Sequence, residues 1–239
     1  MIKRLFSILL AISLLIPPSV WAAVTYDTDT SGQKASPGTT LTVSHTVTAG
    51  GSNRAIYVLC GIDSATATLT ATYAGAAMTA VRNDAHASVS TRTYIFRKSD
   101  PATGANNWVV TQSVGEPMIC WALSATGVHQ TTPETDSDGT CPAATASVTL
   151  TLTTASGELL LDILGFSNTD ATAVTEGADQ TAEMLLEQGT AYEAAGSRQP
   201  GSAGGVMSYS WTTNTTPCYS AVSIKAAPGS GASPPIIFP

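Results

Sequence analysis

The sequence predicts an all-β protein, a two-sheet antiparallel β-sandwich of about ten strands with jelly-roll-like connections. Apolar and polar residues alternate in short segments, as in residues 40–48, where Leu41, Val43, His45 and Val47 share one face. Turn-forming residues separate such segments at intervals of roughly 8–15 residues. No long segment has the periodicity of a helix. Short alternating segments with frequent turns are typical of two packed sheets.

The elements follow in chain order. Continuous apolar segments predict strands that are covered on both faces at residues 55–62, 118–126 and 158–166. Further strands are expected at residues 40–48, 65–73, 77–81, 93–97, 108–112, 147–153, 206–212 and 219–226. Residues 182–188 fit a helical turn or a strand, and the surrounding strands favour a strand. The polar segments 130–146 and 194–205 are expected to be surface loops, suited to crossings between sheets.

The N-terminus has the pattern of a secretory signal over residues 1–22. Lys3 and Arg4 precede an apolar run at residues 5–16, and small residues follow at the usual cleavage positions. An uncleaved membrane anchor is the alternative. It is disfavoured because the apolar run has ~12 residues, whereas spanning a bilayer takes ~20. Export to the extracellular space or the cell surface is therefore expected, with the periplasm as the alternative.

Residues 23–227 are expected to form a single β-sandwich domain. Residues 228–239 are rich in Pro, Gly and Ser and are expected to be a flexible tail. The tail carries Ile236, Ile237 and Phe238, which form a candidate docking segment for the exposed sheet edge of a neighbouring copy. A disordered end without such a role is the favoured interpretation.

The net charge of −7 limits the partners. Nucleic acid requires clustered Lys and Arg, and anionic membrane surfaces also attract basic segments. The candidate partners that remain are the chain itself and cell-surface or extracellular glycans. We expect no nucleic acid, no membrane insertion after signal removal and no cofactor.

Four cysteines, an even number in an exported chain, predict two disulfides. No C-x-x-C motif is present, which disfavours a redox pair or a structural zinc site. Three pairings are possible. Cys60 and Cys120 both lie in apolar segments, whereas Cys141 and Cys218 both lie beside prolines. We therefore favour the pairs Cys60–Cys120 and Cys141–Cys218.

No residue pattern points to catalysis or to a metal site. Residues 27–32 and 136–139 carry alternating carboxylates, but solvated turns explain both segments. Asp162 lies in an apolar segment and is expected on an outward face or hydrogen-bonded at a sheet edge. The three histidines are dispersed, and His45 is expected to be an interior residue with hydrogen-bond partners. The sequence therefore predicts a protein that is not an enzyme.

Aromatic residues offer one route to a binding function, because an aromatic ring can stack on the apolar face of a sugar. Trp121 and Trp211 fall within predicted strands and are expected in the core. Trp108 and Tyr192 are the better candidates for ligand-facing aromatics.

Several segments in order resemble a known family. They are Ser-Asn-Arg at 52–54, Thr-Tyr-Ala-Gly-Ala-Ala-Met-Thr at 72–79, Asp-Pro-Ala-Thr-Gly-Ala-Asn at 100–106, Gly-Val-His-Gln-Thr-Thr-Pro at 127–133 and Gly-Ser-Arg-Gln-Pro-Gly at 196–201. They are similar to bacterial extracellular β-sandwich domains of poorly characterised function, found in large surface, adhesin-like and structural proteins. The likeness covers most of residues 38–227. It implies a jelly-roll-like sandwich with a non-enzymatic, surface-associated role, and it supplies no catalytic residues.

The resulting hypothesis is a secreted, non-enzymatic structural or surface-adhesion protein, with self-association left open. The alternative is a carbohydrate-binding module.

Overall fold

A computed structural model describes residues 22–167, 173–190, 192–201 and 205–229. Within these ranges all regular secondary structure is β, in seventeen strands arranged as four antiparallel sheets. The all-β class is therefore confirmed, but the prediction of two sheets and about ten strands is wrong. No helix long and apolar enough to cross a bilayer is present in the described ranges. Most of the predicted signal segment and the tail residues Ile236, Ile237 and Phe238 lie outside them.

The first half of the chain builds two sheets. Its strands are β1 (Thr25–Lys34), β2 (Thr40–Val47), β3 (Ala55–Ile62), β4 (Leu69–Tyr73), β5 (Ala76–Ala77), β6 (Thr79–Ala85), β7 (Arg92–Ser99), β8 (Gly104–Gln112) and β9 (Met118–Thr126). The first inner sheet has the order β1-β9-β3-β7-β6, and the first outer sheet has the order β2-β8-β4-β5.

The second half builds the other two sheets. Its strands are β10 (Glu134–Thr140), β11 (Thr145–Thr151), β12 (Leu159–Ser167), β13 (Thr175–Glu176), β14 (Thr181–Gln188), β15 (Tyr192–Pro200), β16 (Val206–Thr215) and β17 (Pro217–Ile224). The second inner sheet has the order β10-β17-β12-β15-β14, and the second outer sheet has the order β11-β16-β13.

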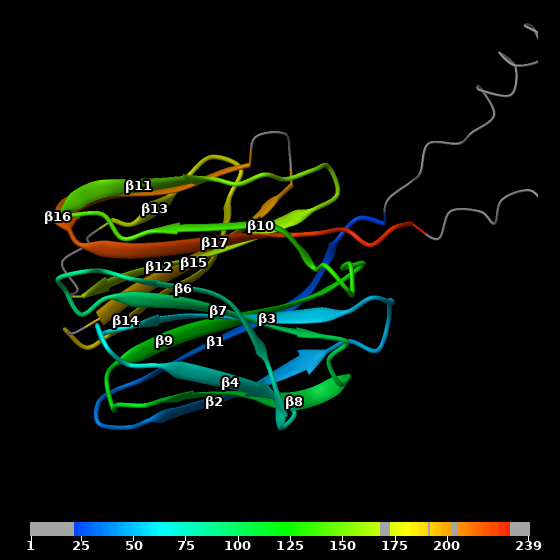
Figure 1. The fold of residues 1–239 in the computed structure, drawn as a ribbon, viewed down its shortest axis with the longest axis horizontal. Helices are drawn as coiled ribbons and strands as arrows, with labels where there is room; N and C mark the ends of the chain where they lie inside the picture. Colours follow the sequence, from blue (N-terminus) through cyan, green and yellow to red (C-terminus); the bar gives the residue numbers. More distant parts are fainter. Residues whose placement is uncertain (1–21, 168–172, 191, 202–204, 230–239) are drawn as a thin grey trace, which may run out of the picture.

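The four sheets stack as layers, with the two inner sheets face to face in the middle (Figure 1). Strand β3 shows how the sequence produces this stack. Ile56 and Val58 pack towards the first outer sheet, whereas Tyr57 and Leu59 pack towards the second inner sheet. Both faces of an inner strand are buried, which explains its continuous apolar sequence. A third apolar core lies between the second inner and second outer sheets.

The second half repeats the architecture of the first. Strands β1–β4 and β6–β9 correspond in order to β10–β17, and both inner sheets then have the same strand order. The irregularities also match. Strand β6 has a bulge between Ala80 and Arg82, and β14 has one between Ala182 and Met184 at the equivalent register. Strands β1 and β10 carry a second matched pair of bulges.

Several segments that were expected to be turns or loops are strands. Residues 27–32 lie in β1 and residues 136–139 lie in β10. These two strands are edges of the inner sheets, where a partly exposed strand tolerates Thr, Ser and Asp. The expected loops 130–146 and 194–205 contain β10 and most of β15.

Strand β15 is rich in small residues because it packs closely. A Cβ atom on Gly196 would lie 2.3 Å from the Trp121 indole nitrogen. Small residues in this segment therefore indicate close packing and not a loop. Residues 182–188 form part of β14, which confirms the strand interpretation.

Candidate functional site

A buried carboxylate lies at the centre of the second inner sheet. Asp162 belongs to β12, the middle strand, and is fully buried, so the expected outward or edge position is wrong. Its neighbours Leu161 and Ile163 pack against the first inner sheet. Alternation along the strand therefore directs the Asp162 side chain towards the second outer sheet.

Donors from four segments surround this carboxylate. The backbone N–H of Ser197 donates to Oδ1 at 2.7 Å, and the Ser197 hydroxyl lies 3.0 Å from both carboxylate oxygens. The Tyr209 hydroxyl donates to Oδ1 at 3.1 Å, and that of Tyr219 to Oδ2 at 2.7 Å. Gln180 Nε2 donates to Oδ2 at 3.2 Å. A buried carboxylate requires such partners, and here the protein supplies all of them.

Burial raises the pKa of Asp162 to about 7, although hydrogen bonds from Tyr219 and Ser197 act in the opposite direction. Burial also raises the pKa values of Tyr209 and Tyr219 well above their usual value, so both phenols remain protonated donors. The Asp162 carboxyl can therefore take up and release a proton near neutral pH.

The amide of Gln180 is held at both ends. Its Nε2 donates to the Ser197 hydroxyl at 2.7 Å, and its Oε1 accepts the backbone N–H of Ser208 at 2.7 Å. The turn before β14 places this amide, because the N–H of Gly177 also donates to the Ser208 carbonyl at 2.8 Å. A base, a hydroxyl and a polarised amide are thus in one contact network.

Sequence reasoning singled out Asp162 but did not identify its partners. Ser197, Tyr209 and Tyr219 come from three different strands, β15, β16 and β17. Their spacing along the chain does not show that they are neighbours, because the strand order of the sheets determines which residues meet. A buried acidic residue in an apolar strand was the available signal, since such a group requires donors from neighbouring strands.

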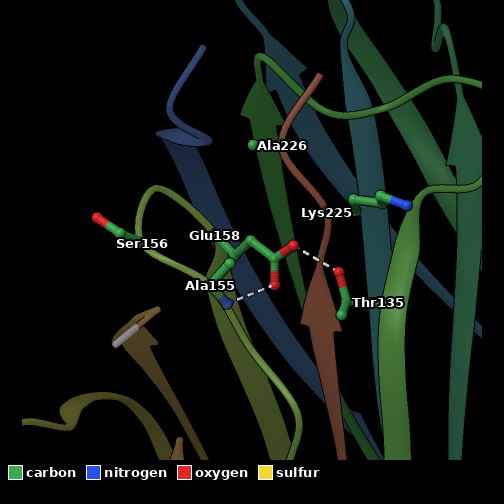
Figure 2. A pocket seen from close by; sticks show the side chains of 6 residues that line it. All are labelled: Thr135, Ala155, Ser156, Glu158, Lys225 and Ala226. Atoms are coloured by element: carbon green, nitrogen blue, oxygen red, sulfur yellow. Dashed lines mark hydrogen bonds between the residues drawn. The ribbon is translucent and has the colours of Figure 1, made fainter. Parts of the chain in front are cut away.

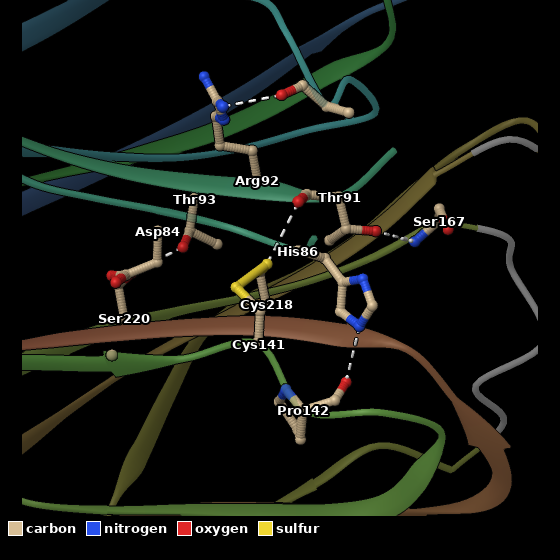
Figure 3. The surroundings of a disulfide bond; sticks show 12 residues. Asp84, His86, Thr91, Arg92, Thr93, Cys141, Pro142, Ser167, Cys218 and Ser220 are labelled. Carbon is tan, nitrogen blue, oxygen red and sulfur yellow. Dashed lines mark hydrogen bonds between the residues drawn. A yellow bond between two sulfur atoms is a disulfide. The ribbon is translucent and has the colours of Figure 1, made fainter. Parts of the chain in front are cut away.

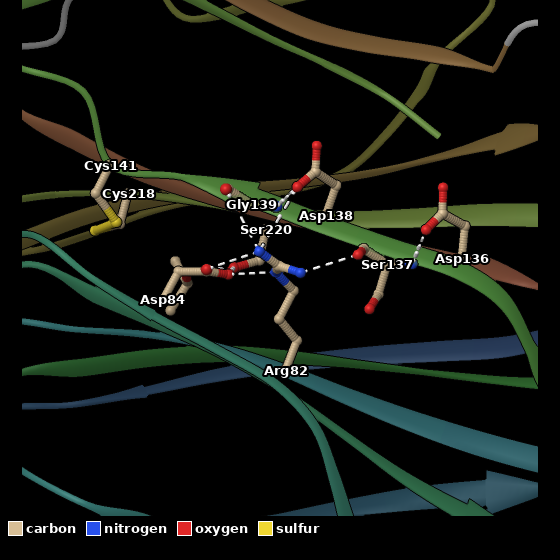
Figure 4. A network of polar contacts seen from close by, with 10 residues as sticks. Arg82, Asp84, Asp136, Ser137, Asp138, Gly139, Cys141, Cys218 and Ser220 are labelled. Atoms are coloured by element: carbon tan, nitrogen blue, oxygen red, sulfur yellow. Dashed lines mark hydrogen bonds and ion pairs between the residues drawn. A yellow bond between two sulfur atoms is a disulfide. The ribbon is translucent and has the colours of Figure 1, made fainter. Parts of the chain in front are cut away.

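A second polar cluster joins the edges of the two inner sheets (Figure 4). Arg82 of β6 pairs with Asp84 at 2.6 and 2.9 Å and donates to the Ser137 carbonyl of β10 at 2.9 Å. Ser220 of β17 donates to Asp84 at 2.6 Å. Asp138 lies 3.7 Å from Arg82. The carboxylates of residues 136–139 therefore take part in contacts within the protein.

A pocket of about 240 Å³ lies beside the turn before β12 (Figure 2). Its lining residues are Thr135, Ala155, Ser156, Glu158, Lys225 and Ala226. The Glu158 carboxylate accepts hydrogen bonds from Thr135, Thr154, Ser223 and the N–H of Ala155. The Lys225 side chain points away from it. The carboxylate in this pocket is thus occupied by donors of the protein itself.

Both disulfides have the pairing predicted from the sequence. Cys60 and Cys120 face each other directly across β3 and β9, and Cys141, just after β10, is bonded to Cys218 of β17. Figure 3 shows the second bond beside His86, whose ring nitrogen lies 3.1 Å from the Pro142 carbonyl oxygen. Each bond joins neighbouring strands within one half of the chain. Two disulfides fit an oxidising, extracellular-type environment.

The two aromatic residues expected to face a ligand are both fully buried, so that prediction is wrong. Trp108 packs between the first two sheets, where its indole donates to Thr30 at 3.0 Å. Tyr192 packs between the inner sheets. Inward positions on strands within a four-layer stack leave no exposed face for either ring. Trp121 and Trp211 are in the core as predicted.

His45 is also interior, as predicted. Its ring nitrogens lie 3.3 Å and 3.0 Å from the hydroxyls of Thr28 and Thr30, and burial lowers its pKa.

Among the described residues, no group of three or more His, Cys, Asp or Glu side chains is placed to hold a metal ion. Comparison of the chain with protein-family models, with curated proteins and with solved structures gave no match.

Proposed function

We propose that this chain is a secreted, non-enzymatic structural or surface-adhesion protein with jelly-roll-like sandwich halves, and that it self-associates. The observation that carries the proposal is the cross-bracing of the inner sheets. A disulfide fixes two neighbouring strands in each half, and the two halves are then joined by ion pairs and by a continuous apolar core. Such bracing suits a protein that has to persist outside the cell.

Three observations support export. Disulfides form and persist in oxidising compartments. The N-terminal sequence has a basic start and a short apolar run, which is the pattern of a secretory signal. The ordered segments that resemble bacterial surface domains point to the same location.

Self-association is supported by an edge strand. Strand β14 is an edge of the second inner sheet, and its Leu185 side chain is 54% exposed. Unpaired strand edges with apolar side chains favour pairing with another chain. The tail residues Ile236, Ile237 and Phe238 have the apolar character of a segment that adds to such an edge.

The experiment combines location with assembly. The full chain is expressed in a bacterial host, and protease treatment of intact cells then shows whether the protein is released, surface-exposed or internal. Sedimentation of the purified protein gives its assembly state. We expect an extracellular or surface-exposed protein that forms oligomers, and fewer oligomers when the chain ends at residue 229. An internal protein, or a monomer at all concentrations, would overturn the corresponding part of the proposal.

A second variant, L185K, tests the β14 edge, because it places a charge on the exposed edge and leaves the core unchanged. Loss of oligomers in L185K but not in the chain ending at residue 229 would assign assembly to the β14 edge. The opposite result would assign it to the tail.

A further inference from the structure

We propose that the side chains of Ser197 and Gln180 condense into an intramolecular ester, with Asp162 as general base and the backbone N–H of Ser208 as the oxyanion donor. The product is a covalent cross-link inside the second half of the chain. This inference goes beyond the proposed function and does not depend on it. It rests on how these four groups contact one another.

The hydroxyl of Ser197 is placed between a base and an amide. Its oxygen lies 3.0 Å from both oxygens of Asp162, so the hydroxyl proton faces the carboxylate. The same oxygen accepts a hydrogen bond from Gln180 Nε2 at 2.7 Å, which holds the amide group beside the hydroxyl; attack requires the amide to turn so that its carbon atom faces this oxygen. A nucleophile within hydrogen-bonding distance of its base is the arrangement that covalent chemistry requires.

The oxygen of the Gln180 amide has a donor of its own. Its Oε1 already accepts the N–H of Ser208 at 2.7 Å. When an oxygen adds to the amide carbon, negative charge develops on Oε1, where this donor is already directed. A donor held in place before the reaction stabilises the charge without reorganisation.

The step balances without an external reactant. Asp162 accepts the Ser197 hydroxyl proton, the Ser197 oxygen bonds to the Gln180 amide carbon, and the carbonyl electron pair moves to Oε1. The carbonyl then re-forms and the bond to Nε2 breaks. Asp162, whose Oδ2 lies 3.2 Å from Nε2, returns the proton to the departing nitrogen, and ammonia leaves. The products are an ester, ammonia and a regenerated carboxylate.

Two properties of the site support the step. A carboxyl group with a pKa of about 7 both accepts and returns a proton near neutral pH. Asp162 and Ser197 are fully buried and Gln180 is half-buried, so the Ser197 side of the ester is shielded from water once it has formed. The bond would tie the turn before β14 to β15 and would hold the edge strand in place.

The decisive measurement is the intact mass of the full chain, produced where disulfides form and incubated at neutral pH. We expect a mass lower by one ammonia than that of the oxidised chain, and a branched peptide that joins Gln180 to Ser197 after digestion. Hydroxylamine should separate the two peptides. A mass without this deficit, or a deficit that maps to other residues, would overturn the proposal.

Variants assign the roles. S197A and Q180E should retain the full mass, since one lacks the nucleophile and the other lacks the amide. D162N should abolish the cross-link or slow it strongly, because Asn is not a base. S210A, which removes an exposed serine from β16, should cross-link like the natural chain. Circular dichroism checks that each variant is folded, and cross-linking in folded S197A would contradict the assignment.

Discussion

Arg97 and Arg198 occupy equivalent positions in the two halves of the chain. Each lies opposite the first threonine of its neighbouring edge strand, Thr79 for Arg97 and Thr181 for Arg198. Each also reaches across to the other half. Arg97 pairs with Glu134 of β10 at 2.5 Å, and Arg198 lies over the ring of Tyr26 of β1, 4.6 Å from its centroid.

Glu134 and Tyr26 are themselves equivalent, since each directly precedes the matched bulge of its strand. The contact between the halves is therefore approximately symmetric, with an ion pair on one side and a cation–π contact on the other. Each arginine also has a partly buried carboxylate partner: Glu134, which accepts the hydroxyl of Tyr57 at 3.0 Å, for Arg97, and Glu183 of β14 for Arg198.

The first prediction concerns the contribution of these two arginines to stability. R97A should destabilise the fold by about 2 kcal/mol, because it leaves a partly buried carboxylate with one donor fewer. R198A should cost a similar amount, about 2 kcal/mol, because it removes the cation–π contact with Tyr26 and the ion pair with Glu183, whose side chain is only 10% exposed. Urea unfolding measures both values. R54A is the control, because its partner Asp100 is 80% exposed and such pairs contribute ~0–1 kcal/mol. A cost for R54A equal to that of R97A would contradict the prediction.

The second prediction concerns the closest approach of the inner sheets. Tyr192 places its hydroxyl against Gly61 of β3 and Gly165 of β12, and a Cβ atom at Gly61 would lie 2.6 Å from that oxygen. G61A should therefore destabilise the protein by about 1–3 kcal/mol, the usual cost of overpacking. The same substitution in a Y192F background should cost less, because the clashing atom is absent. Equal costs in the two backgrounds would show that the clash is not the cause.

The third prediction concerns the disulfides. The two cysteines of the first bond are separated by 60 positions in the sequence, and those of the second by 77. Each bond should therefore stabilise the fold by about 4 kcal/mol, because it restricts the unfolded chain. Replacing both cysteines of one pair by alanine should lower the urea midpoint, and the decrease should be similar for the two pairs. Because loop length enters only as a logarithm, a large difference between the two double variants would contradict this account.

The sequence predicted most strands because apolar alternation is a local property. It did not predict four sheets, because layering depends on which strands pair. The apolar segments of β3, β9 and β12 were predicted to be covered on both faces. The predicted fold had only two sheets, which cover each other on one face. Two outer sheets packed on two inner sheets cover both faces of these strands instead.

The misassigned loops have a physical reason of the same kind. The sequence of strand β10 is Glu-Thr-Asp-Ser-Asp-Gly-Thr, and these polar residues are typical of a turn. They form a strand here because they are at a sheet edge and contact Arg82 of the other inner sheet. The candidate site could be predicted only in part, for the same reason. Asp162 is conspicuous in an apolar strand, whereas Ser197 and Gln180 are ordinary residues until β15 and the turn before β14 are packed beside it.

The fourth prediction is the pH dependence of stability. The pKa of Asp162 rises from an ordinary 3.8 to about 7 on folding, so the folded protein binds a proton that the unfolded chain releases. Stability from this group is therefore present at low pH and is lost as the pH rises to about 7, by up to ~1.4 kcal/mol per pH unit. The buried His45, whose pKa is lowered, acts in the opposite direction below about pH 6.5.

Comparing the natural chain with D162N isolates the contribution of Asp162, because the effect of His45 is common to both. The difference in unfolding free energy should change with pH up to about 7 and then become constant. D63N is the control, since burial raises the pKa of Asp63 only to about 6 and its difference curve should level off earlier. Parallel stability curves for D162N and the natural chain would mean that the Asp162 carboxyl keeps the same proton affinity on folding, because linkage requires a slope wherever the two affinities differ.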